Sequence, residues 1–265
     1  MQKITTIEQY KRIIELNPYK HMTNHYMFLN ETQEYIDNGL LFYDDSGHSS
    51  ALLLYLKHKQ FYKLFLYTSE TDKLSIPILD KPTVTEIIFI ESKGEPLLAD
   101  ILRNSGFVHL ILFKQYYVSH ADLHLSNSNL GDYQIVYATE DQIPAILSIL
   151  HNTFLDITNE LPDELTLKKR VNEKCVLSVI NPHGEVCGCN QWQRRNEMCL
   201  IKHTTIIPEL RGIGLGEKLE VETFKKVNAK GYTCWVAEDN NIKQKMDAKH
   251  GYRFNGKYML KLVLK

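Results

Sequence analysis

The chain has 265 residues, of which 31 are lysine or arginine and 32 are aspartate or glutamate, so its formal net charge at pH 7 is −1. A charge this close to zero gives no reason to expect a nucleic-acid or anionic-membrane partner. The longest clean apolar run, residues 51–56, is far too short to span a bilayer,. All five cysteines lie in the second half, mostly in strand-like runs, which predicts buried thiols in a reducing, cytoplasmic environment,.

The first half predicts a mixture of short helices and strands. Its helices are expected over residues 6–16, 25–36 and 95–103, and its strands over residues 40–43, 50–56, 62–67, 85–90 and 108–118,. Residues 121–132, rich in Ser, Asn and Leu, are typical of a linker,. Because the length favours two units, the sequence predicts a first domain over residues 1–120 and a second over residues 133–265.

The second half predicts strands and helices that lead into and out of one glycine-containing loop. In chain order we expect a strand and helix over residues 135–147, a hairpin over residues 176–180 and 185–193, a strand over residues 198–207, a helix from residue 217, a strand over residues 232–237, and a short helix ending at residue 250,. Thr139 is a natural N-cap for the first of these helices, and Pro182 and Gly184 form the turn of the hairpin,.

The loop itself reads Arg211-Gly212-Ile213-Gly214-Leu215-Gly216. A turn with little side-chain bulk allows several backbone N–H groups to converge at the start of a helix. The positive end of the helix dipole adds to them, so the loop predicts a site for phosphate oxygens, with a pyrophosphate as the expected ligand.

Two classes of ligand fit such a loop. A dinucleotide site requires the motif Gly-x-Gly-x-x-Gly, with an acidic residue about 20 positions later. In this chain the third glycine, Gly216, comes one place early, and Glu217 occupies the position where that glycine should be. The pattern Arg-x-x-Gly-x-Gly is matched without a gap by Arg211, Gly214 and Gly216. Together with the flanking elements over residues 133–265, it resembles the coenzyme A loop of the GCN5-related N-acetyltransferases.

That resemblance implies an α/β fold in which a mixed, mostly antiparallel sheet is flanked by helices. Residues 104–107, Asn-Ser-Gly-Phe, resemble residues 249–252, Lys-His-Gly-Tyr. Each segment follows a predicted strand and short helix and leads into a final strand, so the first half looks like a second, degenerate copy of the same unit. Residues 69–81 contain no glycine, and this copy is therefore not expected to hold coenzyme A. The alternative for the first half is an unrelated α+β domain.

The resemblance also implies a donor site for acetyl-CoA. The pantetheine arm would pair like an added strand with Thr205, Ile206 and Ile207, and the pyrophosphate would lie on the loop from Arg211 to Glu217. Asn240, after the next strand, completes the expected binding set.

The resemblance implies fewer catalytic residues than coenzyme-binding residues. Where the family often has a glutamate on the strand before the loop, this chain has Leu200, so His203 and Glu238 are the candidate general bases,. Adjacent strand residues face opposite sides, and an irregularity in the strand could reverse the face that His203 takes. The tyrosine that protonates the departing thiolate in the family is replaced by Asp247, and the alanine before it by Lys243.

A metal site is not expected. The pairs His21/His25 and His120/His124 have i, i+4 spacing, but neither has a third ligand nearby in sequence,. Cys187 and Cys189 would share a strand face, which predicts buried packing,.

We therefore expect a tandem, acetyl-CoA-dependent N-acetyltransferase whose acceptor is an amine of a small molecule or a peptide. It is expected to bind neither nucleic acid nor membrane and to be a monomer or homodimer. Two alternatives remain open: a non-catalytic coenzyme-binding regulatory or scaffold protein, and an acyltransferase that uses a longer acyl-CoA or a carrier-protein thioester.

Overall fold

A computed structural model describes residues 1–16, 22–26, 29–45, 49–56, 59–74, 76, 79–125 and 131–265. The chain divides into two compact units. Unit 1 comprises Met1–Leu112 together with Gly256–Lys265, and unit 2 comprises Phe113–Asn255.

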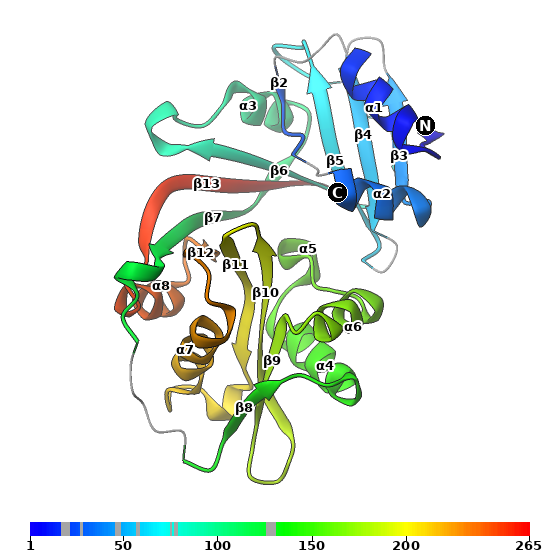
Figure 1. Cartoon of the computed structure of the whole chain (residues 1–265). Helices are drawn as coiled ribbons and strands as arrows, with labels where there is room; N and C mark the ends of the chain where they lie inside the picture. The colour runs from blue at the N-terminus through cyan, green and yellow to red at the C-terminus, as the bar shows by residue number, and fades with distance from the viewer. Residues whose placement is uncertain are drawn as a thin grey trace. The chain divides into compact units, whose positions relative to one another are not determined.

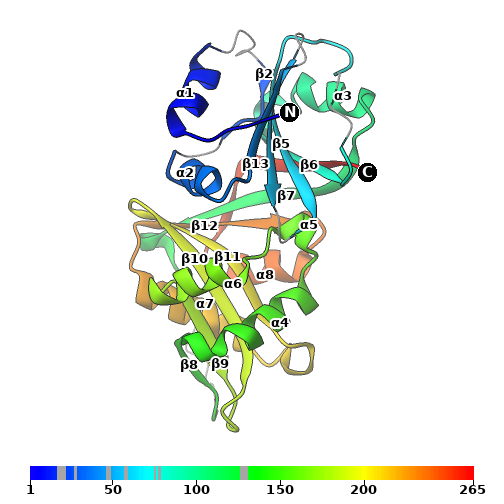
Figure 2. The same cartoon turned by 90° about the vertical axis from the view of Figure 1, so that its right-hand side faces the viewer.

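Unit 1 is a sheet with helices on both faces. Its strands, in spatial order, are β1 (Gln2–Lys3), β3 (Leu41–Asp45), β4 (Ser49–Leu56), β5 (Phe61–Thr68), β6 (Thr83–Ile90) and the unit 1 part of β13 (Arg253–Leu264), and β2 (Met22–Thr23) pairs separately with β5. Helices α1 (Ile7–Leu16) and α2 (Leu29–Asp37) lie on one face and α3 (Leu97–Asn104) on the other (Figure 2). Among the described strands of unit 1, β5 and β6 are the parallel pair.

Unit 2 repeats this plan. Its strands, in spatial order, are the unit 2 part of β7 (Val108–Ser119), β12 (Gly231–Ala237), β11 (Met198–Ile206), β10 (Val186–Arg195), β9 (Val176–Ile180) and β8 (Gln134–Tyr137). Helices α4 (Ile143–Thr153), α5 (Asp156–Asn159) and α6 (Glu164–Asn172) cover one face, and α7 (Leu215–Val227) and α8 (Asn241–Lys249) the other (Figure 1). In the part of unit 2 that the structure describes, β11 and β12 are the parallel pair.

A separate apolar cluster packs the helices against each face of the unit 2 sheet. Leu219 and Phe224 of α7 pack with Tyr232 of β12 in one cluster. Ile146 of α4 packs with Leu167 of α6 in the other. Strands β9 and β10 supply residues to both clusters, Leu177 and Cys187 to the first and Val176 and Cys189 to the second, so these two strands are apolar on both faces,.

The compact units do not follow the sequence order that the predicted ranges 1–120 and 133–265 assume. Residues 257–264 of β13 pair with β6 in unit 1, and residues 113–119 of β7 pair with β12 in unit 2. Each sheet thus takes a strand from the other half of the chain. Of the predicted linker, residues 126–130 lie outside the described residues, and the 3₁₀ turn His120–Asp122 belongs to unit 2.

Most predicted elements are present with shifted ends. The helix after the glycine loop begins at Leu215, two residues before the predicted start, because Gly214 takes the N-cap position. The helix expected from residue 25 is α2 (Leu29–Asp37), and residues 24–26 are not helical. No helix in the described part of the chain is long and apolar enough to cross a membrane.

Candidate functional site

The glycine loop folds as a tight entry into α7. Gly212 and Gly214 both have positive φ angles, 85° and 89°, and a side chain on either would point into open space. Gly214 is the N-cap and offers no side chain to the helix amides. Within the described residues, the N–H groups of residues 212–216 have no backbone acceptor, so they form a cluster of donors at the positive end of α7,.

Arg211 anchors this loop to the preceding strand. Its side-chain Nε donates to the carbonyl of Ile206 at 2.9 Å, while the rest of the residue is exposed. Gly216 lies in the first turn of α7, where a Cβ would be 3.8 Å from Ile206 and 4.0 Å from Met246 of α8. These are ordinary van der Waals distances, so the packing of α8 on the start of α7 leaves room for a Cβ at this position.

The strand before the loop separates from its parallel neighbour. Residues 198–201 of β11 pair with residues 231–234 of β12, and the pairing ends there. We call residues 204–206 the diverging edge of β11. No other strand in the described part of unit 2 pairs with the β12 side of this edge, so its outward backbone groups, apart from the Ile206 carbonyl that accepts from Arg211, are available to an added strand,.

The alternation of N–H and C=O directions along β11 decides which backbone groups face outward, that is, away from β10. The N–H of Ile207 donates to Cys187 of β10 at 2.9 Å, and the carbonyl of Thr205 lies against Gly188 of β10. Because backbone groups alternate along a strand, Thr204 and Ile206 point away from β10. Of the three residues predicted to pair with pantetheine, only Ile206 has backbone groups that face away from β10; those of Thr204, which was not in that prediction, face the same way, because the sequence does not reveal the hydrogen-bonding register.

A bulge sets the position of His203. Between the pairs Asn190↔Thr204 and Trp192↔Ile201, β11 contains one residue more than β10. Cys199 and Ile201 pack in the cluster of α7, whereas after the bulge it is Thr204 that contacts α7, through a 3.2 Å hydrogen bond to Glu220,. The bulge therefore turns His203 toward the opposite face.

His203 is buried there, with 7% of its surface exposed. Its Nε2 lies 3.0 Å from the carbonyl of Asn159 in α5, and its ring packs on Phe154 at 5.5 Å. Next along the strand on the same face, Thr205 shares a 3.0 Å hydrogen bond with Thr153 at the end of α4. The segment between α4 and α6 thus positions His203 beside the diverging edge.

Glu238 and Asn240 follow β12. The Glu238 side chain is half exposed and forms an ion pair with Lys114 of β7 at 3.0 Å. Asn240 is the N-cap of α8, and its Oδ1 accepts from the N–H of Lys243 at 3.1 Å. Capping α8 is therefore one role of the predicted ligand-binding asparagine.

Asp247 lies in the interior, not at an accessible reaction centre. It is fully buried and shares the Lys243 ammonium with Glu220, which is 1% exposed. The Cys234 thiol donates to its Oδ2 at 3.4 Å. Burial raises the pKa of Asp247 to about 6, the Glu220 charge acts in the same direction, and Lys243 opposes both. Sequence position alone does not reveal that α7 supplies the second carboxylate.

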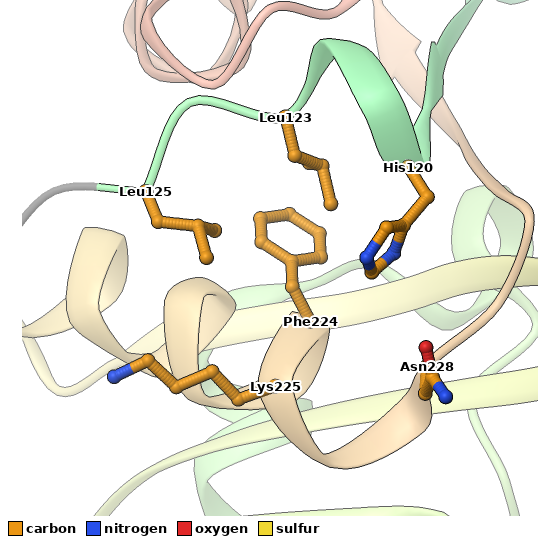
Figure 3. Close-up of a pocket in the computed structure, with 6 residues that line it drawn as sticks. All are labelled: His120, Leu123, Leu125, Phe224, Lys225 and Asn228. Atoms are coloured by element: carbon orange, nitrogen blue, oxygen red, sulfur yellow. The ribbon is translucent and has the colours of Figure 1, made fainter.

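One further pocket lies in unit 2, at the other end of α7. It encloses 390 Å³ and is lined by His120, Leu123, Leu125, Phe224, Lys225 and Asn228 (Figure 3). None of the predicted site residues lines it. The His120 ring lies 6.4 Å from the tilted ring of Tyr232, and His25 of the other predicted pair contacts the Tyr10 hydroxyl at 2.7 Å. His21 lies outside the described residues, among which no cluster of three metal-binding side chains occurs.

Comparison with solved structures identifies the fold. An acetyltransferase of the GCN5-related (GNAT) family from Colwellia psychrerythraea matches with 13% identity and a TM-score of 0.55, covering 100% of this chain and 99% of that one. A tandem GNAT protein from the clavulanic acid biosynthesis pathway matches with 12% identity and a TM-score of 0.54, covering 83% and 80%. A GCN5-related N-acetyltransferase from Sphaerobacter thermophilus matches with 10% identity and a TM-score of 0.57, covering 82% and 76%.

No family model matches the sequence, and no curated protein matches it. At these identities the likeness concerns the fold, which is that of the GCN5-related N-acetyltransferases,. The predicted fold class, a mixed sheet flanked by helices and matched by a tandem protein, is confirmed.

Proposed function

We propose that unit 2 binds acetyl-CoA and transfers its acetyl group directly to an amine in a ternary complex. The observation that carries this proposal is the meeting, at one place, of the diverging edge of β11 with the exposed amide donors of residues 212–216. A long ligand that has both a phosphate group and a peptide-like arm fits this combination. The fold likeness supports the proposal without fixing the acceptor.

The donor would be held by backbone groups. The pyrophosphate oxygens would accept from the amides of residues 212–216, where the dipole of α7 also favours negative charge,. The amides of the pantetheine arm would pair with the outward backbone groups of Thr204 and Ile206. Neither contact requires a particular side chain, which explains why small residues dominate the loop.

Bound acetyl-CoA supplies a thioester whose carbonyl carbon accepts the amine nitrogen while its carbon–sulfur bond breaks. A residue of this chain must take one proton from the amine. His203 is the first candidate: because a backbone carbonyl can only accept, its contact with Asn159 places the ring proton on Nε2 and leaves Nδ1, itself a buried atom, as the basic nitrogen,. Glu238, half exposed and held by Lys114, is the second candidate,.

Asp247 is not suited to return a proton to the departing sulfur, because it is buried and bound to Lys243. A thiolate with a pKa near 8.5 can leave without an acid, so transfer remains feasible. The same burial favours a second candidate function, a coenzyme-binding regulatory protein without turnover.

The donor is tested first by thermal shift and titration calorimetry with acetyl-CoA, coenzyme A and NAD. A ligand at 100 times its dissociation constant stabilises by about 2.7 kcal/mol, which corresponds to a rise in Tm of about 5–10 °C for a unit of this size. Gly214→Glu should abolish the rise, because it introduces a carboxylate among the phosphate donors. Gly184→Glu is the matched control, since Gly184 also has a positive φ, 84°, and open space around it.

A response to NAD alone would overturn the donor assignment. If coenzyme A binds, turnover is then followed by thiol release with a panel of small amines and peptides. His203→Ala should lower kcat by about 10²–10⁴-fold and remove an ionisation near neutral pH. Binding without turnover for every amine would favour the regulatory function, and an unchanged pH profile in the variant would transfer the role of base from His203 to another group.

A further inference from the structure

The two parallel strand pairs of the chain end in the same way. In unit 1, residues 62–64 of β5 pair with residues 83–85 of β6, and the pairing stops although both strands continue. This repeats the separation of β11 from β12 in unit 2. Unit 1 therefore has a diverging edge of its own, residues 66–68 of β5.

In unit 1 this edge is occupied by the chain itself. Met22 and Thr23, which form β2, pair antiparallel with Thr68 and Tyr67. β2 thus lies along the diverging edge of β5 as an added strand, where the equivalent edge of β11 has no partner strand in the described part of unit 2. Its backbone satisfies groups that would otherwise face an opening between strands.

Asn24 closes the point where β5 and β6 separate. Its Nδ2 donates to the carbonyl of Leu64 on β5 at 3.0 Å and to the carbonyl of Glu86 on β6 at 3.0 Å, and it also contacts Thr85 at 2.7 Å. Its Oδ1 accepts from the N–H of Leu66 at 2.8 Å. With 8% of its surface exposed, Asn24 is a buried carboxamide that bonds to both strands as an amide of a bound ligand would,.

Unit 1 also lacks the phosphate half of a donor site. The described residues between β5 and β6, namely 69–74, 76 and 79–82, contain neither a helix nor a glycine. No helix N-terminus in this stretch offers converging amides.

We propose that residues 22–24 fill, in unit 1, the place that the coenzyme arm takes in unit 2. The Asn24 side chain holds them there through its hydrogen bonds to β5 and β6, and we call this residue the latch. This inference rests on the proposed function for its comparison with the coenzyme. It follows that the chain binds one coenzyme, in unit 2, and that the unit 1 site is closed by a permanent internal strand.

The first test measures the latch without any ligand. Hydrogen exchange of the Leu66 amide is followed by NMR in the full chain. Asn24→Ala removes the acceptor and should accelerate this exchange by about tenfold or more. Asn38→Ala is the matched control, because Asn38 is exposed at the end of α2 and bonds only to the local carbonyl of Glu34. Equal Leu66 exchange in both variants would overturn the latch.

The second test counts coenzyme A by titration calorimetry. The wild-type chain should bind one molecule, Asn24→Ala should also bind one, and Gly214→Glu should bind none. Two molecules per chain, or binding that survives in Gly214→Glu, would overturn the closed site. No binding to the wild-type chain would refute the proposed function instead, and the exchange result would still decide whether residues 22–24 are held by Asn24.

Discussion

Lys243 is the shared partner of two buried carboxylates, and its removal gives the sharpest test of the packing beneath the candidate donor site. Its ammonium contacts Glu220 of α7 and Asp247 of its own helix, which are 1% and 0% exposed. Lys243→Met keeps the apolar stem and removes the charge. Two neighbouring carboxylates are then left in the interior without their cation.

Breaking a buried ion pair by removing one partner costs about 3–5 kcal/mol, and we expect a loss of that size at pH 8. The loss should shrink in acid. The pKa of Asp247 is already raised to about 6. The Lys243 charge lowers this pKa, so removing the charge raises the pKa of Asp247 further. A carboxyl whose folded pKa exceeds its unfolded value stabilises the fold below that unfolded value and loses this contribution as pH rises through the folded pKa. At pH 5 the loss should therefore be smaller by about 2 kcal/mol.

The assay is urea unfolding followed by tryptophan fluorescence. Both tryptophans of the chain, Trp192 and Trp235, lie in unit 2, so the signal reports the unit that contains the cluster. Lys230→Met is the control, because its ion pair with Glu197 is 73% and 65% exposed and should contribute less than about 1 kcal/mol at either pH,. A Lys243→Met loss below about 1 kcal/mol, or an equal loss at pH 5 and pH 8, would refute this reasoning.

Two other changes test neighbouring parts of the sheet. Gly188→Ala places a Cβ 2.8 Å from the backbone carbonyl of Thr205, so it should lower the free energy of unfolding by about 1–3 kcal/mol, measured in urea,. Gly216→Ala is the control, because its Cβ would have its nearest contact at 3.8 Å. A similar loss of stability in both variants would contradict the clash with Thr205 as the cause. Burial raises the pKa of the Cys189 thiol to about 12, so a thiol reagent should label Cys175, which is partly exposed, far faster in the native protein,. Comparable labelling of both, read by mass spectrometry, would contradict the burial of Cys189.

The glycine turn into α7 could be predicted from the sequence because its signal is local. Gly212 and Gly214 stand where the backbone takes a positive φ, and Gly216 follows in the first turn of α7. These requirements lie within a few residues of one another. The fold class was predictable for a related reason, since each strand and helix carries its own periodicity.

The faces of the catalytic candidates could not be predicted, because they depend on one extra residue in β11. The bulge turns His203 away from α7, and nothing in the sequence from Met198 to Ile206 marks it. The burial of Asp247 depends on Glu220, which is 27 positions away by the residue numbers. Strand partners are equally non-local: the sequence of β13 shows that it is a strand, but not that β6 is its neighbour.

The exchange of β7 and β13 has a consequence for synthesis. Unit 1 needs residues 257–264 to complete its sheet, so its β6 edge stays without this partner until those residues have left the ribosome,. Unit 2 has all its residues available earlier. The sheet of unit 1 is thus completed after all the residues of unit 2 have been made, and a chain interrupted before residue 257 would carry an open β6 edge able to pair with another molecule,.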